Sequence, residues 1–330
     1  MLLTTAAALA PRIAAAEAPP PPVFAEFGER QPDRTACDQA IDKGADFLVS
    51  PVVAAKDGTL FVAPGNELST LTDIARRPEF ADRRKDKTVD GQAVSGWFTE
   101  YFNPAELKTL AIAPAPRGGG RTPLPLLTLQ EVIDIARAGS VRQARVVGIS
   151  PRLVHPDYFA GLELNLEPRL ADLIRLAGYN SRAAAMIVQG REPAALKTLA
   201  GLCGVRLTQL IDAEGGPADA KAMRYAAMIS ADGLTAVKTW ASAVGPAEAL
   251  LIQPGAKGAI LATALAKAAH DAGLAVYARA APPGPHEPYG APRARLTALF
   301  LAGADGVMCA DVGLAVKARG EAMSRRRGGG

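Results

Sequence analysis

Short apolar runs alternate with helical patterns along most of this chain, and the alternation limits the folds open to it. Eight runs are predicted as strands, each followed by a helical stretch: residues 23–27, 47–53, 145–149, 185–189, 205–211, 243–244, 274–277 and 306–309. The predicted helices include residues 193–202, with Pro193 in the first turn, and residues 260–272, and Asp33 is predicted to cap the first helix. Strands that are separated by helices form parallel sheets with helices on their faces. Eight such units predict an α/β protein with a (β/α)8 TIM barrel rather than an open sheet.

The second strand is the start of a recognisable strand-turn-strand unit. Residues 47–66 read F-L-V-S-P-V-V-A-A-K-D-G-T-L-F-V-A-P-G-N. This pattern predicts a buried strand, a tight turn at Lys56-Asp57-Gly58 and a second strand over residues 60–63. In a (β/α)8 barrel, the carboxyl end of such an early strand lies on the active-site face.

Residues 67–127 interrupt the alternation. The segment is too long for a simple crossover and predicts an insertion at the barrel mouth. Its aromatic residues Trp97, Phe98, Tyr101 and Phe102 are typical of a local core beneath the insertion. The other interpretation is an exposed surface for a protein partner.

The ends of the chain have a different composition from the middle. Residues 1–18 are apolar and end in small residues, which predicts a signal peptide and a periplasmic or secreted protein. Residues 19–22 form a proline spacer, residues 23–324 are predicted as a single barrel domain, and residues 325–330 as a disordered tail. No other window is long and apolar enough to span a membrane.

Composition argues against some partners. The formal net charge is only +4 and aromatic residues make up 5% of the chain, so a basic stripe interleaved with stacking rings is not expected, and neither is nucleic-acid binding. The three cysteines, Cys37, Cys203 and Cys309, have no metal-like spacing and sit in apolar runs. They are typical of small buried side chains.

Several motifs resemble the glycerophosphodiester phosphodiesterase family, in particular its exported bacterial members. The matching stretches are P-D-R-T at 32–35, G-A-D-F-L at 44–48, K-D-G-T-L at 56–60, T-D-I-A-R-R-P-E-F-A-D-R-R at 72–84, G-W-F-T-E-Y-F-N-P-A-E-L-K-T-L at 96–110, L-T-Q-L-I-D-A at 207–213 and A-D-G-V at 304–307. The two stretches inside the insertion are the most specific. The resemblance implies a TIM barrel and phosphoric diester hydrolysis in glycerol and lipid metabolism.

Family members hold Ca²⁺ or Mg²⁺ on carboxylates and use two histidines as general acid and base. Hard cations of this kind take oxygen ligands, and histidine has a pKa near neutrality that suits proton transfer. The resemblance places neither a histidine nor a metal-binding carboxylate at these positions. The opening His-Arg pair falls on Phe24 and Ala25, or after a short deletion on Glu29 and Arg30, and the second histidine falls on Pro64. The metal carboxylates fall on Val49, Pro51 and Arg152, and a motif lysine falls on Val154.

The resemblance therefore implies a protein of this family that has lost its catalysis, and no cofactor is expected. The site positions Val49, Pro51, Arg152 and Val154 carry one positive charge, so the pocket is expected to accept a phosphodiester or another anion through Arg152 and Arg30. Val154, Gln189, Tyr277 and Cys309 are predicted to line it. No particular protein partner is indicated.

The chain's histidines are only three, and each has a structural interpretation. His155 is expected at a helix start, His270 on a helix surface and His286 in a proline-rich loop. Two alternatives to an inactive barrel stay open. One is a working hydrolase that uses other residues, with candidates Glu26, Glu29, Asp57, Glu67, Tyr277 and Cys309, and the other is a purely structural or protein-interaction role.

Overall fold

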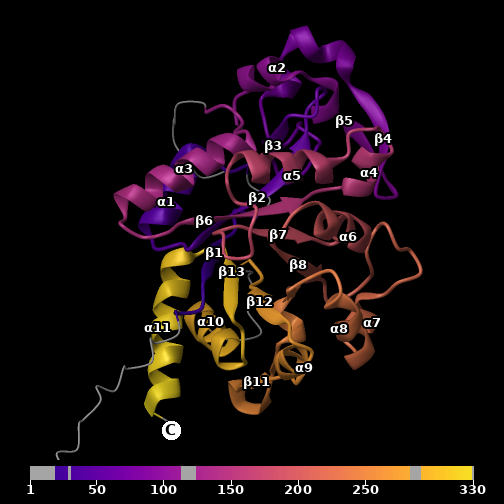
Figure 1. Cartoon of the computed structure of the whole chain (residues 1–330). Helices are drawn as coiled ribbons and strands as arrows, with labels where there is room; N and C mark the ends of the chain where they lie inside the picture. Colours follow the sequence, from indigo (N-terminus) through magenta and orange to yellow (C-terminus); the bar gives the residue numbers. More distant parts are fainter. Residues whose placement is uncertain (1–18, 29–30, 113–123, 283–290, 329–330) are drawn as a thin grey trace, which may run out of the picture.

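The computed structural model describes residues 19–28, 31–112, 124–282 and 291–328, and its centre is a closed parallel barrel (Figure 1). The barrel strands are, in chain order, β1 Val23–Ala25, β2 Phe47–Ala54, β6 Gly148–Leu153, β7 Ile187–Gly190, β8 Arg206–Ile211, β9 Ala243–Pro246, β12 Ala275–Arg279 and β13 Gly306–Cys309. Strand β1 pairs with both β13 and β2, which closes the sheet. The predicted (β/α)8 TIM barrel is confirmed.

Helices surround the strands (Figure 1). Their bounds are α1 Arg34–Asp42, α2 Pro104–Thr109, α3 Leu129–Arg142, α4 Pro156–Ala160, α5 Leu166–Leu176, α6 Pro193–Leu202, α7 Tyr225–Met228, α8 Ala231–Val237, α9 Leu265–Asp271, α10 Pro292–Leu301 and α11 Val312–Gly328. Polar residues set several of the starts. Asp33 caps α1 by accepting from the amide of Ala36 at 2.7 Å, as its sequence position predicts. Thr128 and Glu131 form a capping box at α3.

The core has two parts because side chains on a strand alternate between the two faces of the sheet. The larger part lies between the strands and the helices. The smaller part fills the barrel interior with Phe24, Phe47, Val49, Ile187, Leu210, Ala243, Tyr277 and Met308. The rings of Phe24 and Phe47 stack with their centroids 4.8 Å apart. The barrel is therefore closed below its mouth by packed apolar side chains.

The insertion forms a small unit of its own between β3 (Leu60–Val62) and α3. It contains an antiparallel hairpin of β4 (Lys85–Val89) and β5 (Gln92–Gly96), the helix α2, and short 3₁₀ turns at Ile74–Arg76, Pro78–Arg83 and Thr99–Tyr101. Phe98 and Phe102 are completely buried, and the ring of Phe102 packs edge-on against Phe80. The aromatic cluster is a local core, so it offers no exposed surface at these two residues.

The structure corrects two of the predicted elements. The strand expected at 145–149 is β6 and begins at Gly148, because Arg145 instead donates to the carbonyls of Ile41 and Ala45. It continues through Pro151, a residue that normally ends a strand. The helix expected at 260–272 is only α9, because residues 260–262 form β11 (Ile260–Ala262), which pairs with β10 (Ile252–Pro254). A short apolar run does not distinguish strand from helix.

The ends of the chain also differ from expectation. Helix α11 runs to Gly328, whereas a disordered tail was expected from residue 325. Arg325 stabilises this last stretch through an ion pair with Glu321 at 2.6 Å, and Arg326 donates to the carbonyl of Phe300. The predicted signal peptide, residues 1–18, lies outside the described residues, so export stays a prediction. No described helix has both the length and the apolar character to span a membrane.

Candidate functional site

The carboxyl ends of the parallel strands bring five charged side chains to the barrel mouth. Glu26, Asp212 and Arg279 stand two residues beyond the apolar interior residues Phe24, Leu210 and Tyr277 on their strands. The five residues are Glu26 after β1, Arg152 on β6, Arg191 after β7, Asp212 after β8 and Arg279 at the end of β12. We call this group the arginine mouth. Its three guanidinium groups and two carboxylates leave one net positive charge.

Arg152 is held from both sides. Its Nη2 donates to Oε1 of Glu26, and the two side chains are only 12% and 18% exposed. Its Nε donates to Oε1 of Gln189 at 3.4 Å. Gln189 in turn donates to Oγ of Ser150 at 2.6 Å, inside the barrel. This chain of hydrogen bonds orients the Arg152 guanidinium before any ligand arrives.

Asp212 joins the other two arginines. It accepts from Nε of Arg191 at 2.9 Å and from Nη2 of Arg279. Arg279 is further fixed by the backbone, because Nε donates to the carbonyl of Gly245 and Nη2 to that of Ile211, both at 3.0 Å. Burial opposes ionisation of Asp212, but the charges of Arg279 and Arg191 outweigh it and lower the pKa of this carboxyl.

The guanidinium groups keep donors free for a ligand. Among the described residues, no partner is found for Nη1 of Arg152 and Arg279 or for either Nη atom of Arg191. Burial lowers the pKa of Arg279, and the charge of Arg191 adds to this, whereas Asp212 and Glu26 oppose it. Arginine stays charged under such conditions. Planar N–H groups of this kind bind carboxylates and phosphates well.

The residues on which the resemblance places the family's catalytic and metal-binding positions lie mostly in the barrel interior, the outer core or the β2–β3 pairing. Phe24 and Val49 pack in the barrel interior, and Ala25 packs on the outer side of β1. Pro51 lies on β2 where this strand pairs with β3, and the amide of Ala63, the residue before Pro64, donates to its carbonyl at 2.9 Å. The described residues contain no group of three or more His, Cys, Asp or Glu that could hold a metal ion.

The predicted lining residues separate into three places. Gln189 lies beside Arg152 at the mouth. Tyr277 lies deeper, with its ring 5.1 Å from Phe24. Val154 and Cys309 pack in the outer core, between strands and helices. Arg30 lies outside the described residues.

The side chains proposed for a working hydrolase are mostly engaged in structural contacts. Asp57 accepts from the amide of Thr59 in its turn, and Glu67 accepts from the amides of Ser69 and Trp97. Burial raises the pKa of the Cys309 thiol to about 12, so it stays protonated at neutral pH. Glu29 lies outside the described residues. Of the described candidates, Glu26 alone belongs to the arginine mouth.

Arg191, Asp212 and Arg279 were not predicted as site residues. A signal for them exists in the sequence. Asp212 stands one residue beyond the predicted strand at 205–211. Arg191 and Arg279 each stand two residues beyond a predicted strand, the one at 185–189 and the one at 274–277. In a parallel barrel, charged residues at such positions converge on the active-site face.

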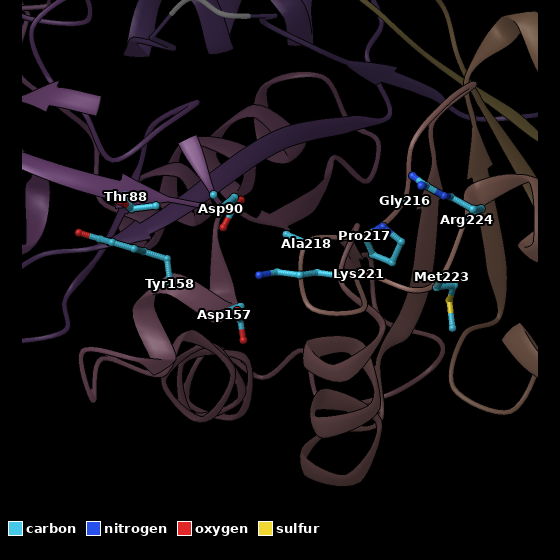
Figure 2. A pocket seen from close by; sticks show the side chains of 11 residues that line it. Thr88, Asp90, Asp157, Tyr158, Gly216, Pro217, Ala218, Lys221, Met223 and Arg224 are labelled. Carbon is cyan, nitrogen blue, oxygen red and sulfur yellow. The ribbon is translucent and has the colours of Figure 1, made fainter. Parts of the chain in front are cut away.

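The hairpin of the insertion contributes to a second site feature, a cavity shared with α4 and the loop after β8 (Figure 2). Asp90, at the tip of the β4–β5 hairpin, contacts Nδ1 of His155 at 2.6 Å. His155 is the residue before α4, as expected, and takes a left-handed backbone conformation. A cavity of about 380 Å³ lies between the hairpin tip, α4 and the loop after β8. Figure 2 shows Lys221 extending from that loop toward Asp90 and Asp157.

A buried hydrogen bond also ties the insertion to the barrel. Glu100, which is 6% exposed, accepts from the hydroxyl of Tyr158 on α4 and from Nδ2 of Asn66. Burial raises the pKa of Glu100, and these hydrogen bonds only partly oppose it. The insertion is thus linked to α4 and its N-cap at two places, through Asp90 with His155 and through Glu100 with Tyr158.

Comparison with known proteins bears on the class of this barrel. No protein-family model matches the chain. Glycerophosphodiester phosphodiesterase GDPD6 of Arabidopsis thaliana is 36% identical over 121 residues, which cover 36% of this chain. The match spans 32% of the length of that relative.

Solved structures share the fold over almost the whole chain. A putative glycerophosphoryl diester phosphodiesterase of Silicibacter pomeroyi superposes with a TM-score of 0.64 and 14% identity, covering 91% of this chain and 93% of its own. A phosphodiesterase of Oleispira antarctica, solved with sn-glycerol-3-phosphate, superposes with a TM-score of 0.60 and 13% identity, covering 91% and 96%.

The solved structures show that the TIM-barrel fold is shared, and the curated match shows similarity to one phosphodiesterase over about a third of the chain. The resemblance to the glycerophosphodiester phosphodiesterase family is confirmed, and the chain is a glycerophosphodiester phosphodiesterase-like protein.

Proposed function

We propose that this barrel binds a phosphate-containing anion at the arginine mouth and does not catalyse metal-assisted hydrolysis of a phosphodiester. The observation that carries the proposal is the convergence of Arg152, Arg191 and Arg279 from three different strands. Three guanidinium groups with free N–H donors match the several oxygens of a phosphate. The ligand class follows from the chemistry of this mouth and from the family resemblance.

The donor set at the mouth does not fit the family's divalent cation. Ca²⁺ takes six to eight oxygen ligands and Mg²⁺ six, mostly from carboxylates, carbonyls and water. Here Glu26 is paired with Arg152, and Asp212 with both Arg191 and Arg279. A cation at this mouth would be repelled by three arginines, whereas an anion would be attracted by them.

A bound phosphate would also replace the Glu26 carboxylate as the partner of Arg152. Glu26 pairs with Arg152 and acts electrostatically on Arg279 as well. A phosphate oxygen can take the place of this carboxylate between the two guanidinium groups. Asp212 would keep Arg191 and Arg279 in position while their Nη groups donate to the ligand.

The proposal predicts metal-independent binding of sn-glycerol 3-phosphate, the product held by the Oleispira antarctica phosphodiesterase. Calorimetry in the presence of a chelator is expected to show binding by the native chain. Arg152→Gln and Arg279→Gln should each weaken it at least about tenfold, about 1.4 kcal/mol, because each removes charged donors. Arg182→Gln serves as the matched control, since Arg182 is exposed in the loop at the amino end of β7.

Different experimental results would contradict different parts of the proposal. No binding of sn-glycerol 3-phosphate or of glycerophosphocholine would contradict the anion site. Unchanged affinity in Arg152→Gln would remove only the role of that residue. Turnover of glycerophosphocholine by pure protein with Ca²⁺ or Mg²⁺ would contradict the loss of catalysis and favour the alternative, a hydrolase that uses residues outside the family motif.

A further inference from the structure

A cavity of about 310 Å³ lies among α4, α5, α6 and the loop after β8, apart from the arginine mouth. Four carboxylates line it: Asp157 on α4, Glu167 on α5, Glu192 at the start of α6, and Asp219 in the loop. None of its described lining residues is lysine, arginine or histidine. We call it the acidic cavity.

Two of these carboxylates are buried and have no hydrogen-bond partner beyond their own residue in the described part of the chain. Glu192 is 5% exposed and Glu167 is 8% exposed. Each accepts a hydrogen bond from its own backbone amide, and neither accepts one from another residue in the described part of the chain. A buried carboxylate without a compensating cation is strongly disfavoured.

Asp219 is only half satisfied. Its Oδ2 accepts from the amide of Ala194 at 2.7 Å, which fixes the side chain at the first turn of α6. Its Oδ1 is buried and has no hydrogen-bond partner among the described residues. An acceptor that is both buried and unpaired points to a donor that arrives with a ligand.

The electrostatics of the cavity agree with this geometry. Burial raises the pKa of Glu167, and it raises that of Asp219, with a further contribution from Asp157. Burial raises the pKa of Glu192 to about 7, and the charge of Asp90 adds to the effect, while Arg191 only partly opposes it. A cation in the cavity would relieve all of these shifts.

The lining selects the kind of cation. Among the described residues, the carboxylates do not form a group able to hold a metal ion. They are instead spread around the wall of the cavity. The lining contains no aromatic ring, and quaternary ammonium groups are usually recognised by such rings. A primary ammonium group carries three N–H donors, which match several separate carboxylate oxygens.

We infer that the acidic cavity is a binding site for a small primary amine, such as an aliphatic diamine. Its ammonium groups would donate to Glu192, Glu167 and Oδ1 of Asp219, and its methylene chain would lie against Ala160, Ala195 and Leu202. The site is independent of the proposed anion site, because no residue of the arginine mouth lines it.

Calorimetry of the full chain at pH 8 with 1,4-diaminobutane tests the inference. Glu192→Gln and Glu167→Gln are each expected to weaken binding at least about tenfold, because each removes a charge of the cavity. Asp172→Asn is the matched control on α5, since Asp172 is exposed and pairs with Arg175. Binding should be tighter at pH 8 than at pH 6, where Glu192 is protonated.

Three results would overturn the inference: no binding of 1,4-diaminobutane, equal binding of tetramethylammonium, or equal binding in both glutamine variants and the native chain. Tighter binding of Ca²⁺ that disappears in Glu192→Gln would also overturn it, because the site would then be a metal site. If a glutamine variant does not fold, Asp219→Asn replaces it, since asparagine keeps the acceptor for the amide of Ala194.

Discussion

Replacement of Phe24 by histidine is expected to lower the free energy of unfolding by about 3 kcal/mol and to produce no phosphodiesterase turnover. The family resemblance places its first catalytic histidine at Phe24, and this residue is completely buried in the barrel interior. Its ring packs 4.8 Å from Phe47 and 5.1 Å from Tyr277. An imidazole there would lose this packing and bury a polar ring among hydrophobic neighbours.

Urea denaturation at pH 8 and pH 6 measures the effect. A histidine buried in apolar surroundings has a lowered pKa, so the folded state binds its proton less tightly than the unfolded chain does. The variant should therefore lose further stability as the pH falls below about 6.5. Phe24→Leu is the control and should cost no more than about 1.5 kcal/mol, with no added pH dependence. Native stability in Phe24→His would mean that this position opens to the mouth.

The stability of the native chain should fall by about 2–3 kcal/mol between pH 5 and pH 8 through the single carboxyl of Glu192. Burial, then the charge of Asp90 and that of Asp219, raise its pKa from the ordinary 4.5 to about 7, against the opposing charge of Arg191. The folded state thus binds this proton more tightly than the unfolded chain. The stabilisation is complete below pH 4.5 and is lost as the pH rises through 7.

Glu192→Gln isolates this contribution from the other titrating groups. The variant should unfold with nearly the same free energy as the native chain at pH 5 and be about 2–3 kcal/mol more stable at pH 8. Asp172→Asn should keep the native pH profile. Saturating 1,4-diaminobutane at pH 8 should return most of the lost stability to the native chain and little to Glu192→Gln. Parallel pH profiles for the native chain and Glu192→Gln would show that this carboxyl titrates normally.

The two proposed sites carry charges of opposite sign and lie at different places near the carboxyl ends of the barrel strands. The arginine mouth has an excess of guanidinium groups, whereas the acidic cavity has only carboxylates among its charged lining. Arg191 and Glu192 are consecutive residues, and they belong one to each site. The end of β7 therefore separates the two, with Arg191 paired to Asp212 and Glu192 facing the helices.

Local patterns in the sequence were sufficient for much of the fold. Strand β13, Gly306–Cys309, and helix α6, Pro193–Leu202, have the predicted bounds because apolar runs and a proline at the first turn are local signals. Asp33 caps α1 for the same reason. The prediction was wrong at β6 and at residues 260–262, where Pro151 and a short apolar run have meanings that depend on neighbouring strands.

The sequence by itself determined the barrel and the family resemblance, because both follow from the order and spacing of residues along the chain. Only the tertiary structure decided which charges meet. Arg152 and Arg279 lie on strands far apart in sequence, and barrel closure brings Glu26 within reach of both. Likewise, whether Glu192 is a solvated or a buried carboxylate depends on how α6 packs against α5 and the loop after β8. Burial and pairing are properties of the folded chain, and they set both the charge and the chemistry of these sites.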